Sequence, residues 1–106
     1  GTLEKGEDPA VCAARELTEE TGYTAETITP FGWFFTSPGV LTEKMYSFVA
    51  TGLTAGRQDL DDNEQIEPQA FTKDELLDLI QKNQIVDAKT VATLLKYFVA
   101  DIRNVL

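Results

Sequence analysis

The first 23 residues, GTLEKGEDPAVCAARELTEETGY (1–23), decide how this chain folds. Asp8-Pro9 is a typical helix start, because Asp caps free N–H groups and Pro is accepted at the first helical position. Gly22 fits the left-handed residue that often follows a helix. We therefore expect a helix from about Asp8 to Thr21.

Three glutamates of this helix, Glu16, Glu19 and Glu20, lie at positions i, i+3 and i+4 and so share one face. Like charges at that spacing repel each other, and a divalent cation would remove the repulsion. Carboxylate oxygens suit hard ions such as Mg²⁺ or Mn²⁺. On spacing alone, a solvated acidic helix face is the more common explanation.

Strand patterns follow the helix. Apolar residues alternate over 31–35, and KMYSFVAT (44–51) is rich in strand-forming residues. The polar segment 53–65 is expected to be an exposed loop, and a further short strand fits 68–71.

Two more helices are expected in the last third of the chain. Thr72 and Glu75 have the spacing of a capping box, followed by apolar residues at helical spacing. Asp87 can cap an amphipathic helix that ends near Asn104.

Composition limits the function. The chain has 106 residues, 42% of them apolar, which is enough for one core. It has 18 acidic and 9 basic residues, no His, and a formal net charge of −9. This charge argues against binding to nucleic acid or an anionic membrane, because phosphate favours Lys and Arg. An anionic substrate would need a bound cation as a bridge.

Cysteine and hydropathy give further exclusions. Cys12 is the one cysteine, so no internal disulfide is possible, and there is no zinc-binding spacing. No apolar run reaches the roughly 18 to 20 residues that span a bilayer, and no signal peptide is visible. By elimination, a cytoplasmic location is expected.

Gly1, Glu7 and RELTEETGY (15–23) together resemble the signature of the Nudix hydrolases. Every strictly specified position is present, and only Tyr23 stands where the pattern asks for an aliphatic residue. The resemblance implies a Nudix-type α/β/α sandwich around a mixed sheet, with 1–106 forming the C-terminal portion of a single Nudix domain.

The resemblance also implies roles for the residues of the signature. Glu16 and Glu20 would be the main metal ligands, and Glu19 would be a further ligand with a part in catalysis. Arg15 would orient these ligands, and Glu7 would support them.

A second resemblance concerns the substrate. SPG (37–39) followed by TEK (42–44) resembles the ADP-ribose pyrophosphatase branch of the family. In that branch, a Pro follows the end of the signature by about as many residues as separate Pro38 from Tyr23 in this sequence. IVDAKT (85–90) resembles the stretch before the last helix of that branch. This implies substrate contacts from Pro38, Gly39 and Glu43, although Ser-Pro-Gly is otherwise an ordinary turn.

DDNEQIE (61–67) resembles the acidic loop that supplies the catalytic base in this branch. Members usually have more Glu in this loop, which leaves the base open between Glu64, which is favoured, and Asp62. A solvated acidic loop explains the same residues equally well.

The expected activity is Mg²⁺-dependent hydrolysis of a nucleoside diphosphate linked to another moiety. ADP-ribose is the favoured substrate, and its products would be AMP and ribose 5-phosphate. Mg²⁺, or Mn²⁺, would bridge the phosphates to the glutamates, and Glu64 or Asp62 would deprotonate a water. Three alternatives stay open. They are hydrolysis of another nucleotide sugar, an oxidised nucleotide or a dinucleotide polyphosphate; nucleotide or partner binding without cleavage; and a purely structural acidic helical domain.

The signature begins at Gly1, and the chain does not open with Met. Relatives of the resembled branch usually have several strands before the signature, so we expect N-terminal strands to be missing here. An incomplete sheet has exposed edges that invite pairing with another chain. We therefore expect a longer protein or a homodimer, with Trp33, Phe34 and Phe35 either at the interface or in the core.

Overall fold

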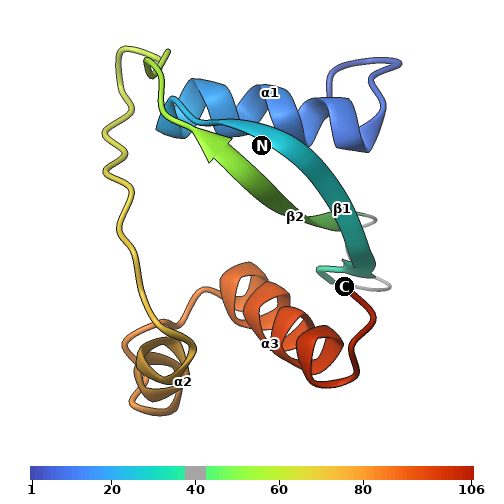
Figure 1. Ribbon diagram of the computed structural model, residues 1–106, viewed down its shortest axis with the longest axis vertical. Helices are drawn as coiled ribbons and strands as arrows, with labels where there is room; N and C mark the ends of the chain where they lie inside the picture. Colours follow the sequence, from blue (N-terminus) through green and yellow to red (C-terminus); the bar gives the residue numbers. More distant parts are fainter. Residues whose placement is uncertain (38–42) are drawn as a thin grey trace. The chain divides into compact units, whose positions relative to one another are not determined.

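The computed structural model describes residues 1–37 and 43–106. The elements follow in the order α1 (Pro9–Thr21), β1 (Thr24–Phe35), β2 (Lys44–Thr54), α2 (Lys73–Gln81) and α3 (Ala88–Ile102) (Figure 1). In this part of the chain, β1 and β2 form one two-stranded antiparallel sheet. The expected α/β class is confirmed.

The described residues fall into two compact units. The first joins Gly1–Pro30 with Phe48–Gln69, and the second joins Phe31–Ser47 with Ala70–Leu106. The prediction of one domain over 1–106, with its layers and mixed sheet, stays a prediction. Within the described ranges, no helix is both long and apolar enough to cross a membrane.

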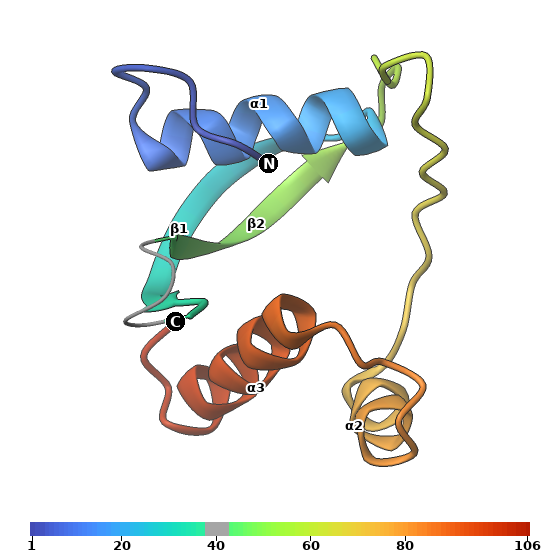
Figure 2. The ribbon, with the colours of Figure 1, turned by 180° about the vertical axis from the view of Figure 1, so that it is seen from behind.

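In the first unit, α1 has the ends that the sequence predicts. The Asp8 carboxylate accepts a hydrogen bond from the N–H of Ala10 at 2.9 Å, and Pro9 is the first helical residue. Gly22 ends the helix with a φ of 79°, and its N–H donates to the carbonyl of Thr18 at 2.8 Å. Figure 2 shows the C-terminal end of α1 beside the start of β1 and the end of β2.

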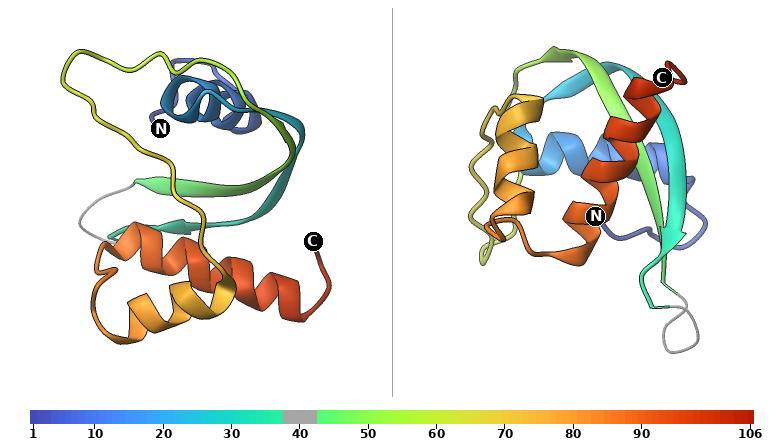
Figure 3. Two further views of the ribbon diagram at one scale, coloured as in Figure 1. Left: turned by 60° about the vertical axis from the view of Figure 1, so that its left-hand side comes forward. Right: turned by 90° about the horizontal axis from the view of Figure 1, so that it is seen from below.

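The second unit contains α2 and α3, which follow each other through a short connection (Figure 3). The capping box of α2 is confirmed, because the N–H of Glu75 donates to Thr72 Oγ1 at 3.1 Å and the N–H of Thr72 donates to Glu75 Oε1 at 2.8 Å. Asp87 caps α3. Phe98 on α3 is buried, and the neighbouring Tyr97 ring packs edge-on against Phe31 of β1.

The strands differ from the prediction in two places. β1 begins at Thr24, well before the apolar alternation, because it pairs along its length with β2 and the hydroxyls of Thr27 and Thr51 hydrogen-bond across the pair. The prediction of a strand at 68–71 is wrong, since these residues form no strand. Of the three aromatic residues, Trp33 and Phe35 are about half exposed, and Phe34 is half-buried.

Candidate active site

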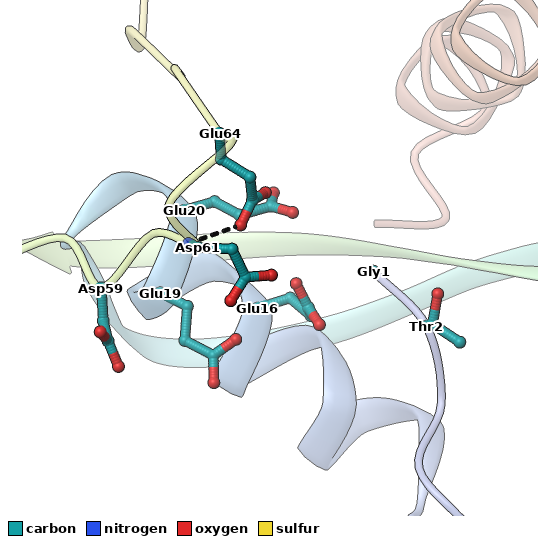
Figure 4. A pocket seen from close by; sticks show the side chains of 8 residues that line it. All are labelled: Gly1, Thr2, Glu16, Glu19, Glu20, Asp59, Asp61 and Glu64. Atoms are coloured by element: carbon teal, nitrogen blue, oxygen red, sulfur yellow. Dashed lines mark hydrogen bonds between the residues drawn. The ribbon is translucent and has the colours of Figure 1, made fainter.

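An acidic cavity of about 410 Å³ lies in the first unit (Figure 4). It is formed by the chain start at Gly1 and Thr2, three glutamates of α1 and three acidic residues of the loop after β2. Every other lining residue is acidic: Glu16, Glu19, Glu20, Asp59, Asp61 and Glu64. The structure therefore brings the predicted metal ligands and the favoured base into one cavity.

The loop after β2 contributes two residues that sequence reasoning missed. Asp59 and Asp61 line the cavity, whereas Asp62, the second candidate base, does not. No periodic pattern marks Asp59 and Asp61, since neither residue belongs to a helix or strand. The resemblance at 61–67 concerns the whole acidic run and does not distinguish Asp61 from Asp62.

Arg15 lies at the centre of the carboxylate contacts. Its Nε and Nη2 each donate at 3.0 Å to one oxygen of Glu7, which is the bidentate arrangement typical of Arg and carboxylate. Its Nη1 lies 3.0 Å from Glu16 Oε1 and 3.2 Å from Glu19 Oε2. Arg15 thus joins Glu7 to two of the predicted ligands, and the orienting role of Arg15 and the supporting role of Glu7 stay predictions.

The charges around Arg15 shift the pKa values of its partners. The Glu7 side chain is 10% exposed, and its hydrogen bonds from Arg15 and from the N–H of Glu4 lower its pKa to about 2. The same bond to Glu7 raises the pKa of Arg15 above its usual value. Arg15 and Glu7 are therefore both charged over the whole physiological range.

The opposite shift occurs at Glu20. Burial raises the pKa of Glu20, and the negative charges of Glu16 and Glu64 act in the same direction. Carboxylates crowded together in this way repel one another when ionised, and a cation between them would relieve the repulsion.

Backbone hydrogen bonds hold the acidic loop in place. The N–H of Asp59 donates to the carbonyl of Glu19 at 2.7 Å, which ties the loop to the last turn of α1. The N–H of Asp61 donates to Glu64 Oε1, and the N–H of Glu64 donates to the carbonyl of Asp61, each at 2.9 Å. The turn thus holds Oε1 of the Glu64 carboxylate, and this bond does not involve Oε2.

The donor set suits a hard divalent cation in its chemistry, since it consists of carboxylate oxygens in one cavity. Among the described residues, however, no three acidic side chains are gathered closely enough to share one ion. Glu16 and Glu19 are instead directed at Arg15. The Arg15 contacts take Oε1 of Glu16 and both oxygens of Glu19.

The predicted substrate-binding residues belong to the other unit or lie outside the described residues. Pro38 and Gly39 are among the residues that the structure does not describe. Glu43 Oε1 pairs with Lys89 Nζ of α3 at 2.9 Å, and this contact and the Thr36 hydroxyl lower the pKa of Glu43. Substrate contacts from these residues stay predictions.

A second cavity, of about 390 Å³, lies in the second unit and contains none of the predicted site residues. It is mainly apolar and is lined from β1, α3 and the chain after it: Phe31, Ala92, Leu95, Lys96, Val99, Ala100, Arg103 and Val105. Its chemistry gives no place for a diphosphate bridged by metal.

Comparison with known proteins gives matches over most of the chain. The NUDIX domain profile matches residues 1–94. The chain is 42% identical over 92 residues to an ADP-ribose pyrophosphatase of Bacillus subtilis (strain 168), which covers 85% of this chain and 50% of that protein. It is 45% identical over 93 residues to a methanol dehydrogenase activator of Bacillus methanolicus, covering 86% and 50%.

A third relative is named for a different activity. The chain is 34% identical over 91 residues to a GDP-mannose pyrophosphatase of Cronobacter sakazakii (strain ATCC BAA-894), covering 83% of this chain and 48% of that protein. The chain thus spans about half the length of the curated relatives it matches.

Proposed function

The chain belongs to the Nudix domain family, and we propose that its acidic cavity hydrolyses a nucleoside diphosphate linked to another moiety with the help of divalent metal. One observation carries the proposal. Six carboxylates from α1 and the acidic loop line a single cavity. A diphosphate cannot approach such a surface without a cation, and the cation and the substrate are therefore expected to bind together.

Each residue has a proposed part in the reaction. When bound, Mg²⁺ or Mn²⁺ supplies positive charge to the diphosphate and makes water more acidic. Glu16, Glu19 and Glu20 are the proposed ligands, and Arg15, which contacts Glu16 and Glu19, is proposed to set the directions of these two before the cation arrives. Mutation of a residue that orients metal ligands in this way typically lowers metal affinity or activity by about 10- to 100-fold.

Glu64 is the proposed general base. It lines the cavity, whereas Asp62 does not. The N–H of Asp61 holds Glu64 Oε1, which leaves Oε2 to take the proton of the attacking water. The water oxygen bonds to one phosphorus, and the bond between that phosphorus and the bridging oxygen breaks.

ADP-ribose is the favoured substrate, and AMP and ribose 5-phosphate are then the products. The 42% identity to a protein named ADP-ribose pyrophosphatase supports this choice. A nucleotide sugar is the second candidate, because a relative named GDP-mannose pyrophosphatase is 34% identical. A homodimer and a cytoplasmic location stay predictions.

The test compares product release from ADP-ribose and GDP-mannose, with and without Mg²⁺ or Mn²⁺, for the unmodified protein, Glu20→Gln and Glu67→Gln. Glu67 is a matched control, because it is an exposed glutamate of the same loop and does not line the cavity. The unmodified protein and Glu67→Gln are expected to release AMP from ADP-ribose only with metal. Glu20→Gln is expected to lose about 100-fold or more of this rate.

Equal turnover by Glu20→Gln and the unmodified protein would contradict the assignment of the metal site. Faster turnover of GDP-mannose would reverse the order of the two substrates. Calorimetric binding of ADP-ribose without product release would instead favour a nucleotide-binding module that does not cleave.

A further inference from the structure

Gln58 joins the two halves of the acidic cavity through one side-chain amide. Its Nε2 donates to the carbonyl of Glu20 at 2.6 Å and to the carbonyl of Ile66 at 2.9 Å. The carbonyl of Glu20 is in the last turn of α1, where helix carbonyls have no partner within the helix. Ile66 lies beyond Glu64 in the acidic loop. One nitrogen thus bonds to α1 and to the far end of the loop.

The direction of the amide follows from its surroundings. Both partners of the Gln58 nitrogen are carbonyl oxygens, which can only accept hydrogen bonds. Turning the amide over would place Gln58 Oε1 against those two oxygens and lose both bonds. A donor is therefore required at this position.

The loop residues that line the cavity lie between Gln58 and its partner Ile66 in the sequence. Asp59, Asp61 and Glu64 lie between Gln58 and Ile66, so the bond from Gln58 to Ile66 closes this segment into a ring. The bond from Gln58 to Glu20 fastens the ring to α1, next to the bond from Asp59 N–H to Glu19. Glu20 therefore takes part in both the loop attachment and the cavity, because its carbonyl accepts a hydrogen bond from Gln58 and its carboxylate lines the cavity.

We propose that Gln58 is a positioning residue that holds the acidic loop on α1, so that Asp61 and Glu64 face Glu16 and Glu20. This inference rests on the proposed function for its catalytic consequence, but the holding itself is a property of the metal-free protein. Loss of the donor frees the loop and leaves every carboxylate of the cavity in the sequence.

Two substitutions of Gln58 test whether its N–H donor, rather than the size or charge of its side chain, holds the loop. Gln58→Glu keeps the shape and places an acceptor against both carbonyls, whereas Gln58→Lys keeps a donor. Gln65→Glu is the control, because it adds the same negative charge to the same loop at an exposed residue that does not line the cavity. Should Gln58→Glu fail to fold, Gln58→Met removes the donor without adding charge.

The first measurement is amide hydrogen exchange of residues 59–66 without metal. Gln58→Glu is expected to accelerate exchange at Asp59, Asp61 and Glu64 by about 10-fold or more, because their amides are protected by the docked loop. Gln58→Lys and Gln65→Glu are expected to exchange like the unmodified protein. Unchanged exchange in Gln58→Glu would overturn the proposal.

The second measurement is hydrolysis of ADP-ribose with Mn²⁺. Gln58→Glu is expected to lower kcat by about 10-fold or more with little change in KM, and Gln58→Lys is expected to restore it. An unchanged kcat beside faster exchange would overturn the positioning role. If the unmodified protein does not hydrolyse ADP-ribose at all, the proposed function fails, and exchange alone then decides whether Gln58 holds the loop.

Discussion

Arg15 and Glu7 show how single residues prepare the cavity. Both oxygens of Glu7 bond to the guanidinium of Arg15, and the N–H of Glu4 also donates to Glu7 Oε1. The pair joins the segment before α1 to the middle of the helix. The Arg15 guanidinium also contacts Glu16 and Glu19, so the pair is linked to two of the proposed ligands.

Replacing Glu7 by Gln is expected to change how stability depends on pH. The Glu7 pKa falls from 4.5 to about 2 in the folded protein, chiefly because of the Arg15 hydrogen bonds. Its stabilisation is therefore fully present above pH 4.5 and is lost as the pH falls toward about 2. The measurement is the free energy of unfolding by urea at several pH values within this range.

In the unmodified protein, stability should fall more steeply over this range than in Glu7→Gln. Glu67→Gln removes an exposed glutamate in its place, and it should keep the steep fall. Parallel curves for the unmodified protein and Glu7→Gln would show that Glu7 contributes nothing to acid stability.

At the scale of elements, the end of α1 and the segment after β2 approach each other at two glycines. Gly22 has a φ of 79°, and a Cβ placed on it would clash with the backbone carbonyl of Gly56. A Cβ on Gly56 would lie 2.7 Å from the carbonyl oxygen of Gly22. These two positions therefore require glycine for the acidic loop to reach the helix.

Gly22→Ala is expected to destabilise the protein more than Gly6→Ala. The two glycines have similar φ values, 79° and 76°, so Ala adds similar backbone strain at each, about 1 kcal/mol. A Cβ on Gly6 meets nothing within 4 Å, whereas a Cβ on Gly22 meets the Gly56 backbone. Urea unfolding of both variants measures the difference, and equal losses would show that the helix and the loop are not in close contact.

Local signals predicted the helices well. Asp8, Thr72 with Glu75, and Asp87 each bond to backbone N–H groups two or three residues away, so the information for a helix start lies within a few residues. The strands depend on pairing across the chain. β1 starts early because it pairs with β2, and residues 68–71 form no strand; no local pattern reveals either.

At the scale of the whole molecule, the candidate site was predicted in part. The helix spacing and the Nudix resemblance identified Glu16, Glu19, Glu20 and Glu64, which share the cavity. Asp59, Asp61 and Gln58 were missed, because their positions depend on backbone bonds between the loop and α1 that form only in the folded chain. Asp62 was predicted from the same acidic run, and only folding separates it from Asp61.

The net charge of −9 and the six carboxylates of the cavity lead to one expectation for the molecule. A cation that binds the folded protein stabilises it in proportion to the logarithm of its concentration above the Kd. The chain should therefore unfold at a higher temperature in Mg²⁺ or Mn²⁺, and the effect should depend on the glutamates of α1.

The most direct measurement is calorimetric titration of Mn²⁺ into the unmodified protein, Glu20→Gln and Glu67→Gln. The unmodified protein and Glu67→Gln are expected to bind Mn²⁺ saturably with the same affinity. Glu20→Gln is expected to bind about 10-fold more weakly or worse, because it removes a charged ligand from the cavity. Equal affinity in Glu20→Gln and the unmodified protein, or no binding to either, would contradict a metal centre on α1.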